Sequence, residues 1–347
     1  MTEDRHPPGL DLPRLGAYLD RTHPGLAVGP LRGRLIEGGR SNLTYAVTDG
    51  VSRWVLRRPP LGHVLATAHD MAREHRVISA LRDTAVPVPR TVALCRDETV
   101  LGAPFYLMEY VPGTPYRSAE QLAELGPRAT AALVRELVDT LAALHAVDPG
   151  RVGLGDFGRP EGFLERQLAR WDRQLAASHS RDLPGMDELR ATLGRTLPPS
   201  GDAAVVHGDY RLDNVLAAPP GSDGPGRWIR AVLDWEMSTL GDPLTDLGLL
   251  VMYSGLPATT PVPVATTGTA PGHPSPEELV DQYATASSRD VSRIGWYTAF
   301  ACFKLAVILE GIHYRHTLGQ TVGAGFDRIG DLVPFLVDRG LTTARKG

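Results

Sequence analysis

Apolar and polar residues alternate with a period of two in several segments of residues 30–111, a pattern typical of strands that bury one face. The strands that this alternation predicts lie within 30–39, 43–49, 53–59, 91–97 and 104–111. Asp49-Gly50 separates two of them and is a strong hairpin signal, and Gly102 lies where the last two join. The first part of the chain is therefore expected to be a meander of strands.

Elsewhere apolar residues recur at spacings of three and four, the period of an amphipathic helix. Two such segments accompany the strands, at 11–21 and from Ala66 to Leu81. The later helices that the pattern predicts lie at 118–147, 161–178, 185–196, from 276 onward and near 290–316. Short apolar runs among these helices predict an island of strands at 203–209, 214–218 and 228–235. Residues 254–276, rich in Thr, Pro, Ala and Gly, predict a loop.

The change from strands to helices predicts an α+β chain with a small β-rich part followed by a larger helical part. We expect an N-terminal helical extension at 1–24, a β-rich lobe at 25–112 and a helical lobe at 113–347. A length of 347 residues suits two compact units better than one small core.

Composition narrows the class of protein. The chain has 40 acidic and 36 basic residues, and this net charge of −4 argues against a protein held to nucleic acid by phosphate attraction. Only Cys95 and Cys302 are present, which excludes a disulfide framework and fits a reducing compartment. The N-terminus lacks the basic start and apolar run of a signal peptide, and no segment offers about 18 uninterrupted apolar residues. We therefore expect a soluble cytoplasmic protein without a membrane or nucleic-acid partner.

The segment 206-VHGDYRLDNVL-216 places charged residues between two apolar runs. Strands can bury its ends while the residues between form a loop whose polar side chains are held by rigid neighbours. Asp209 and Asn214 lie five positions apart in this loop, and Asp234 ends the next apolar strand, in 231-AVLDWEMSTLGDPLTDL-247. The alternative is an ordinary turn in which Asp and Asn bond to nearby backbone. The three residues together favour a functional site.

These residue types match the needs of phosphoryl transfer. A carboxylate orients or deprotonates the acceptor hydroxyl, and further oxygen ligands hold the Mg²⁺ that bridges the ATP phosphates. Protein kinases place a catalytic Asp and a later Asn in one loop, followed by a separate metal-binding Asp. On that pattern Asp209 is the base, Asn214 and Asp234 are the magnesium ligands, and ATP and Mg²⁺ are the expected cofactors.

The motifs HGDYRLDN and LDWEMSTLGDPLTDL resemble the aminoglycoside phosphotransferase family of small-molecule kinases, and the resemblance runs over roughly residues 25–340. It implies the bilobal protein-kinase-like fold, transfer of phosphate to an alcohol group, and His207 as a residue that braces the catalytic loop. Asp242 and Asp246 belong to the same stretch, but Gly-Asp-Pro followed by Asp-Leu is typical of a helix start with Asp as the cap or first-turn acid.

A kinase-like site also needs a loop over the phosphates. The candidate is 37-EGGRSNLTY-45, where Gly38 and Gly39 would let backbone N–H groups approach a phosphate and Ser41 and Asn42 would add donors. The segment lacks the GxGxxG pattern, so an ordinary hairpin turn is the alternative. The downstream motifs favour phosphate contact.

In protein kinases a strand Lys contacts the phosphates and pairs with a helix Glu. Alternation from Val55 gives this position to Arg57, with Glu74 in the following helix as its partner; a surface ion pair is the alternative. Arg holds phosphate by two N–H groups and keeps its charge, so the phosphate geometry differs from the Lys pattern. The adenine is expected beside FYLMEYVPG, with Met108 in its pocket and backbone groups of Glu109 to Val111 at its edge.

The acceptor is expected to bind the helices after residue 160. These helices carry Arg166, Arg170, Tyr314 and Arg315, a basic and aromatic set that suits an anionic or mixed acceptor better than a polycation. Solvated helix faces explain the same residues equally well.

The stretches GGRSNLTY, VLRRPP, AHDMAREHRV and PFYLMEYVPG are also similar to the kinase-like domains fused ahead of acyl-CoA dehydrogenases, and to their free-standing bacterial relatives. That similarity implies a hydroxyacyl-CoA or hydroxy acid as the acceptor. An antibiotic phosphotransferase and a nucleotide-binding regulator without catalysis are the competing hypotheses. The oligomeric state stays open.

Overall fold

The computed structural model describes residues 7–36, 42–61, 70–178, 181–199, 201–219, 226–257, 266–320 and 326–346. The chain divides into two compact units. The first unit contains the residues up to Pro112 together with Arg230–Glu236, and the second contains Gly113–Ile229 and Met237–Gly347. The segment 230–236 thus returns to the first unit, although it follows most of the helical part in sequence.

The first unit is built on a five-stranded sheet in the order β1-β2-β3-β5-β4, with every neighbouring pair antiparallel. Its strands are β1 (Arg32–Leu35), β2 (Leu43–Thr48), β3 (Arg53–Arg58), β4 (Thr91–Cys95) and β5 (Phe105–Glu109). At the hairpin between β2 and β3, Asp49 accepts the backbone N–H groups of Val51 and Ser52. The strands and the hairpin predicted from the alternation are confirmed.

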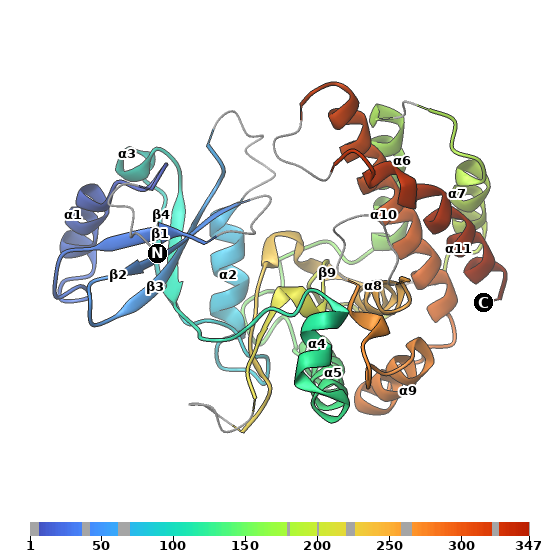
Figure 1. The fold of residues 1–347 in the computed structure, drawn as a ribbon, viewed down its shortest axis with the longest axis horizontal. Helices are drawn as coiled ribbons and strands as arrows, with labels where there is room; N and C mark the ends of the chain where they lie inside the picture. The colour runs from blue at the N-terminus through green and yellow to red at the C-terminus, as the bar shows by residue number, and fades with distance from the viewer. Residues whose placement is uncertain are drawn as a thin grey trace. The chain divides into compact units, whose positions relative to one another are not determined.

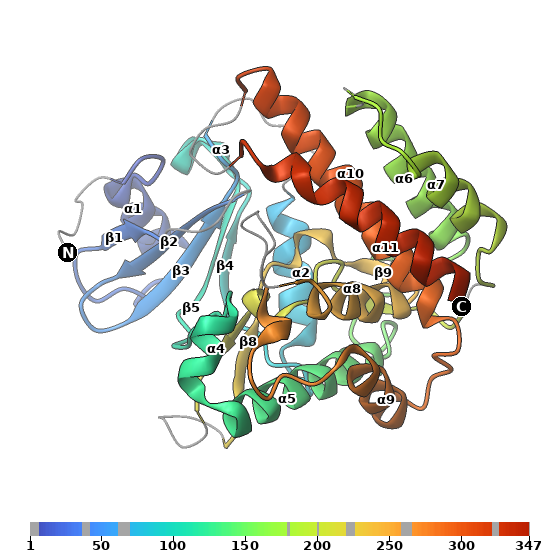
Figure 2. The ribbon, with the colours of Figure 1, turned by 45° about the vertical axis from the view of Figure 1, so that its right-hand side comes forward.

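Helices cover both faces of this sheet (Figures 1 and 2). α1 (Leu12–Thr22) and α3 (Glu98–Leu101) lie on one face, and α2 (Met71–Leu81) lies on the other. The core beneath α1 contains Leu15, Tyr45, Leu56, Phe105 and Leu107, each fully buried. The N-terminal helix is therefore part of the core of the first unit, because its apolar stripe covers the buried face of the sheet.

The start of α2 differs from the sequence-based prediction. The helix begins at Met71 because Asp70 has an extended backbone and its side chain accepts the N–H of Arg73, which is an N-cap. Residues 66–69, which the prediction included, lie outside the described residues. The short helix α3 was also not predicted, because four residues are too few to show a helical period.

The long helix predicted at 118–147 is in fact two helices. These are α4 (Ala119–Leu125) and α5 (Pro127–His145). Gly126 between them has a φ of 82°, a left-handed conformation that ends the first helix, and Pro127 then starts the second. The apolar period continues across this break, so the pattern alone did not reveal it.

The second unit is mainly helical. Its further helices are α6 (Phe163–Ser178), α7 (Met186–Arg195), α8 (Leu244–Ser254), α9 (Pro276–Ser287), α10 (Ile294–Thr317) and α11 (Leu332–Lys346). α10 packs against α11, α8 and α6, and Figures 1 and 2 show it running beside α11. Short strands lie between the helices in sequence: β6 (Ala204–Val206) pairs with β9 (Thr239–Gly241), and β7 (Val215–Ala217) pairs with β8 (Ile229–Val232), of which all but Ile229 belongs to the first unit. The predicted helices and the strand island are confirmed, with shifted ends.

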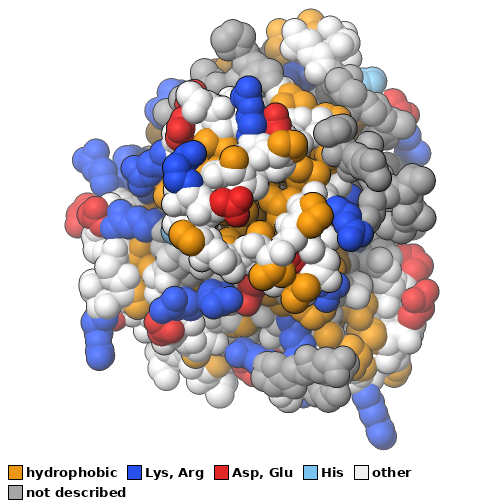
Figure 3. All heavy atoms as spheres, turned by 90° about the vertical axis from the view of Figure 1, so that its left-hand side faces the viewer, with side chains coloured by type: hydrophobic (Ala, Val, Ile, Leu, Met, Phe, Trp, Pro, Cys, Tyr) orange, Lys and Arg blue, Asp and Glu red, His pale blue; other side chains and the backbone are white. Residues whose placement is uncertain are grey.

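Two features are relevant to a membrane or nucleic-acid partner: the apolar helix α10 and the distribution of charge on the surface. α10 is long and apolar enough to cross a membrane by length and composition, but 78% of its apolar window is buried inside the protein, as in the core helix of a globular unit. On the face of the molecule shown in Figure 3, Lys and Arg side chains are separated by acidic, apolar and uncharged ones.

Of the loop predicted at 254–276, residues 258–265 lie outside the described residues.

Candidate active site

The HGD motif forms a tight turn directly after β6. Gly208 has a φ of 86°, a conformation that glycine adopts without strain. A Cβ at this position would lie 2.7 Å from the carbonyl oxygen of Met237, so a larger residue would force the turn to move. The turn leaves the side chain of Asp209 25% exposed.

A buried carboxylate holds this turn in place. Asp246, in the first turn of α8, accepts the backbone N–H of His207 at 2.6 Å and that of Gly208 at 2.8 Å. The Nε2 atom of His145 lies 3.3 Å from the same carboxylate, and its Nδ1 atom lies 2.8 Å from the hydroxyl of Tyr283. Burial acts to raise the pKa of Asp246, but the hydrogen bonds from His145 and His207 outweigh it and hold the pKa below its usual range.

His207 acts on the backbone of the loop. Its imidazole is fully buried, and Nδ1 accepts the backbone N–H of Asp209 at 3.2 Å. The ring also packs edge-on against Tyr210, whose hydroxyl donates to the carbonyl of Leu137 at 2.8 Å. These contacts suit the bracing role that the family resemblance implies for His207.

Asp209 and Asn214 meet in this loop. The Nδ2 atom of Asn214 donates to the carboxylate of Asp209 at 2.9 Å and to its backbone carbonyl at 2.8 Å. The Nε atom of Arg211 lies 3.4 Å from the Asp209 carboxylate and 3.1 Å from that of Asp213. Because the amide nitrogen of Asn214 is used in this way, its amide oxygen is the atom that remains for a metal ion.

In the first unit, Arg57 lies between two carboxylates. Its Nε atom lies 3.1 Å from Glu74, and its Nη2 atom donates to Asp234 at 2.8 Å. Glu74 is 1% exposed and also accepts the hydroxyl of Tyr106 at 2.9 Å. Burial raises the pKa of Glu74, and the positive charge of Arg57 opposes that rise. Burial also disfavours the charged form of Arg57, but the carboxylates of Glu74 and Asp234 act in the other direction and its pKa is raised. The structure thus pairs Arg57 with Glu74, as the strand alternation predicts.

The neighbouring Arg58 has a structural role. Its Nη1 atom donates to the carbonyl of Gly9 at 2.6 Å and to that of Leu101 at 2.7 Å. These bonds tie segments on the α1 side of the sheet to β3. Adjacent residues of a strand face opposite sides of a sheet, which is why one arginine meets Glu74 and the other meets the core.

The predicted phosphate loop is described only at its end. Three of its four predicted residues lie outside the described part of the chain: Gly38, Gly39 and Ser41. Asn42 is 3% exposed, and its Nδ2 atom donates to Glu74 and to Glu236, each at 3.0 Å. Both N–H bonds of the amide are therefore used by carboxylates, and Asn42 supports the ion-pair cluster instead of donating to phosphate as the sequence suggested.

Asp234 has an unusual backbone. Its φ is 65°, a left-handed value that aspartate tolerates better than most residues and that tends to occur at functional sites. The side chain is 32% exposed, and one of its oxygens bonds to Arg57. Magnesium prefers oxygen ligands and usually takes only one or two from the protein in addition to substrate phosphates. The carboxylate of Asp234 and the amide oxygen of Asn214 therefore fit the predicted metal ligands in chemical type.

The expected base-binding face lies on the sheet. Val55 lies opposite both Ala46 on β2 and Met108 on β5, so the three side chains share one face of the sheet with Arg57. Val111, the second residue after the end of β5, has no hydrogen-bond partner for its N–H or C=O group among the described residues. An unpaired backbone edge beside an apolar face is what a nucleotide base needs.

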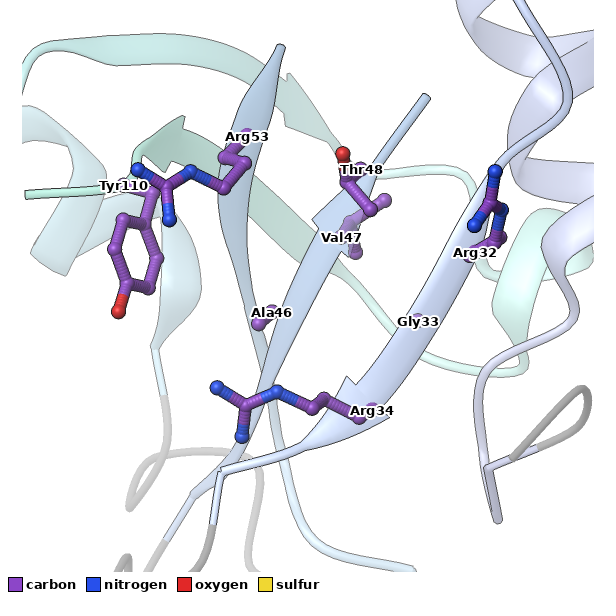
Figure 4. Close-up of a pocket in the computed structure, with 8 residues that line it drawn as sticks. All are labelled: Arg32, Gly33, Arg34, Ala46, Val47, Thr48, Arg53 and Tyr110. Carbon is purple, nitrogen blue, oxygen red and sulfur yellow. The ribbon is translucent and has the colours of Figure 1, made fainter. Parts of the chain in front are cut away.

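A pocket of about 180 Å³ opens next to this face. Figure 4 shows Arg34 and Arg53 extending toward Tyr110, with Arg32 at the other rim and Ala46 between them. The guanidinium of Arg53 lies 4.7 Å from the ring centroid of Tyr110. The carboxylate of Glu109, a residue expected at the adenine edge, accepts the backbone N–H of Arg90 at 2.8 Å, and the N–H of Glu109 donates to the carbonyl of Arg90 at 2.9 Å. Neither its side chain nor its N–H is therefore free for that contact.

Among the described residues, no hydrogen bond or ring contact joins the predicted acceptor residues to one another. The guanidinium of Arg170 on α6 lies 5.3 Å from the ring centroid of Trp171. Arg166 donates to two backbone carbonyls in the turn before α6, and its acceptor role stays a prediction. Tyr314 and Arg315 lie near the C-terminal end of α10, and Arg315 is exposed.

Two residues that hold the backbone of the catalytic loop were not predicted to do so from the sequence. Asp246 was interpreted as a helix-start acid; it does lie in the first turn of α8, but its carboxylate also anchors the HGD turn. Lys304 on α10 donates from Nζ to the carbonyl of Gly208 at 2.7 Å. The available signal was a single lysine in the apolar stretch FACFKLAVIL, because a buried ammonium requires a specific partner.

A small β-rich unit with an arginine–glutamate ion pair and a larger helical unit with an HGD loop define a protein-kinase-like phosphotransferase that acts on small molecules. The chain belongs to the phosphotransferase enzyme family, whose model matches residues 32–284.

The curated relatives are longer than this chain. The chain is 34% identical to acyl-CoA dehydrogenase family member 11 of Gallus gallus over 357 aligned residues, which cover 99% of this chain and 45% of that protein. It is 33% identical to acyl-CoA dehydrogenase family member 10 of Mus musculus, with 92% of this chain and 30% of that protein aligned. The chain spans less than half the length of these relatives.

Solved structures share the fold along nearly the whole chain. A protein of Ralstonia eutropha JMP134, provisionally described as an aminoglycoside phosphotransferase, is 33% identical with a TM-score of 0.83, covering 97% of this chain and 98% of that one. A thermostable variant of aminoglycoside phosphotransferase APH(4)-Ia, in ternary complex with AMP-PNP and hygromycin B, is 15% identical with a TM-score of 0.61, covering 96% and 98%.

Proposed function

We propose that this chain transfers the terminal phosphoryl group of ATP to the hydroxyl group of a small molecule in a Mg²⁺-dependent reaction. The observation that carries the proposal is the loop after β6. There the carboxylate of Asp209 stays 25% exposed, although His207 holds its backbone N–H and Asn214 holds its side chain. A carboxylate that is fixed in position and open to solvent can accept a proton from an incoming alcohol.

Asp209 is the proposed base. As the oxygen of the acceptor hydroxyl bonds to the terminal phosphorus of ATP, the bond from that phosphorus to the bridging oxygen breaks and ADP leaves. The hydroxyl proton passes to the carboxylate of Asp209. Positioning contributes more to such a reaction than covalent chemistry does, so the hydrogen bonds that fix Asp209 are part of the proposed catalysis.

Asn214 and Asp234 are the proposed magnesium ligands, and the ion neutralises charge on the phosphates when it is bound. Arg57 supplies a further positive charge, because Glu74 holds one edge of its guanidinium and a planar guanidinium can bind phosphate oxygens through two N–H groups. The remaining proposed donors to the phosphates are Gly38, Gly39 and Ser41.

The base of the nucleotide is proposed to lie on Ala46 and Val55 beside Met108. Support comes from the shared face of these side chains and from the backbone of Val111, which has no partner among the described residues. Small side chains at Ala46 and Val55 would leave room for a flat ring, and the backbone of Glu109 to Val111 would meet its polar edge.

A hydroxyacyl-CoA or hydroxy acid is the proposed acceptor. The chain aligns with part of proteins named as acyl-CoA dehydrogenase family members, which points to acyl chemistry. Two basic side chains, Arg170 and Lys304, flank Trp171 in the second unit. An aminoglycoside polycation would meet like charge there, which disfavours the competing function as an antibiotic phosphotransferase. That function is supported by the descriptions of similar structures, among them the Ralstonia eutropha protein and APH(4)-Ia.

The test measures ADP and phosphorylated product for the purified chain with ATP, Mg²⁺ and a panel of hydroxyacyl-CoAs, hydroxy acids and aminoglycosides. Asp209→Ala is expected to keep nucleotide binding and to lose about 10²–10⁴-fold in kcat. Asp187→Ala, at a carboxylate that is 98% exposed, is the matched control with unchanged turnover. Wild type that binds ATP but phosphorylates nothing across the panel contradicts the proposal and favours a regulator. Phosphorylation of aminoglycosides alone selects the antibiotic function.

A further inference from the structure

Lys304 is a cation in the middle of the apolar helix α10, next to the catalytic loop. Its Nζ atom donates to the carbonyl of Gly208 at 2.7 Å, one residue before Asp209. An ammonium group carries three N–H donors, and this carbonyl is its one hydrogen-bond acceptor among the described residues. The ammonium of this half-buried side chain therefore has donors left over beside the catalytic loop.

Trp171 on α6 adds another unused donor. The Nζ atom of Lys304 lies 5.6 Å from the centroid of its ring. The indole is 3% exposed, and its Nε1–H has no acceptor among the residues that the structure describes. Buried indole N–H groups normally have a partner, so this exception requires an explanation. Arg170 brings a guanidinium to 5.3 Å from the same ring.

The charges near Lys304 do not supply the missing acceptor. Burial lowers the pKa of Lys304; Asp209 and Asp246 oppose the shift, and Arg170 and Arg211 add to it. The carboxylate of Asp246 is committed to backbone N–H groups of the loop, and that of Asp209 is bonded to Asn214. The indole N–H of Trp171 and two N–H groups of the Lys304 ammonium therefore have no acceptor among the described residues on this side of the loop, and such donors suit an anion.

We infer that Lys304, Trp171 and Arg170 form a subsite for an oxyanion carried by the acceptor, beside the carboxylate of Asp209. The inference rests on the proposed function and narrows its acceptor to alcohols that carry a carboxylate or a phosphate close to the reacting hydroxyl. The oxyanion accepts from the indole N–H and from the ammonium. A neutral alcohol leaves the buried indole N–H and the half-buried ammonium without this acceptor, which is how a polar pocket rejects an analogue that lacks the matching group.

Matched pairs of acceptors test the subsite. Short hydroxy acids with the hydroxyl at successive carbons are each compared with their own primary amide, which keeps the hydroxyl and removes the charge. Glycerol phosphate compared with glycerol forms the second arm and distinguishes a phosphate from a carboxylate as the preferred group. Wild type is expected to show kcat/KM at least about 10-fold higher for the anionic member of one or more pairs, as one or two charged hydrogen bonds supply.

Variants of the subsite show which residues cause the preference for an anionic acceptor. Lys304→Met and Trp171→Phe are expected to reduce that preference to within about threefold, mainly through the KM of the acceptor, with the KM of ATP unchanged. Lys304→Arg is expected to restore part of it. Trp171→Phe keeps an aromatic ring and removes the N–H together with the five-membered ring of the indole, and it serves if Lys304→Met does not fold. Arg173→Met, at an exposed residue of the same helix α6, is the control that keeps the preference.

Three results would overturn the subsite. The first is an equal kcat/KM for acid and amide in every wild-type pair, and the second is a preference for the acid that survives both variants. The third is a Lys304→Met variant whose KM for ATP rises by the same factor whether the acceptor is the acid or the amide. Calorimetric binding of the same pairs to Asp209→Ala separates the two proposals. Selective binding of acids by a chain whose wild type shows no turnover would retain the subsite and refute the kinase. Turnover without any preference would retain the kinase and refute the subsite.

Discussion

The carboxylate of Asp246 accepts the backbone N–H of His207 at 2.6 Å, so the first turn of α8 anchors the loop that presents Asp209. The same carboxylate accepts the N–H of Gly208, and it is 1% exposed. One buried charge thus satisfies two adjacent backbone donors that a tight turn would otherwise leave unpaired. The position of the proposed base depends on a residue far from it in sequence.

Asp246→Asn is expected to lower the free energy of unfolding by roughly 3–5 kcal/mol at neutral pH, because it removes the charge from a buried network whose donors remain. The pKa of Asp246 is lowered in the folded state, so its contribution is present above the usual Asp pKa of about 3.9 and is lost as pH falls through the folded-state pKa. Urea unfolding at neutral and acidic pH checks both effects. Asp187→Asn, at an exposed carboxylate, is the control. Wild-type stability of Asp246→Asn at neutral pH would contradict the anchoring role.

Arg57→Ala is expected to destabilise the first unit by roughly 3–5 kcal/mol, because it leaves Glu74 buried without its cation. Adding Glu74→Gln should recover much of that stability without recovering turnover, since the proposed phosphate cation is still absent. Thermal unfolding and kcat/KM for ATP, measured on the single and double variants, separate the two roles. If the double variant regains full activity, Arg57 serves only the fold.

Removal of Mg²⁺ with a chelator is expected to abolish turnover and leave the unfolding transition of the nucleotide-free chain unchanged. Asp234→Asn and Asn214→Ala are each expected to raise the Mg²⁺ concentration needed for half-maximal rate by about 10–100-fold or more, the scale seen when metal-site groups are changed. Titration of the rate with Mg²⁺ at saturating ATP measures this. Identical titrations for wild type and both variants would exclude these residues as ligands.

Ala46→Phe is expected to raise the KM of ATP at least about 10-fold, because the ring would fill the face shared with Val55 on which the base is proposed to lie. The acceptor KM should change little. Val51→Phe, in the turn between β2 and β3 and 81% exposed in wild type, is the control. Direct binding of a non-hydrolysable ATP analogue checks the prediction, and unchanged affinity in Ala46→Phe would move the base elsewhere.

Much of the fold could be predicted because its signals are local. Alternation predicted the five strands of the first unit, since a strand with one buried face repeats every two residues. The same alternation distinguished Arg57 from Arg58, and the structure pairs only the former with Glu74. Spacing within one loop likewise predicted that Asp209 and Asn214 act together, because five residues of a tight loop cannot separate them far.

The sequence by itself determined the order of strands and helices, the catalytic-loop motif and the arginine that faces the helix, because each depends on a short repeat or a short spacing. Only the tertiary structure decided that Asp246 anchors a turn 39 residues away, that Lys304 reaches a carbonyl 96 residues away, and that Asn42 turns inward to Glu74. Those partners are selected by how helices and strands pack. A buried polar group needs a hydrogen-bond partner, and it bonds to the donor or acceptor that the packing places near it. Local sequence patterns do not show which partner that is.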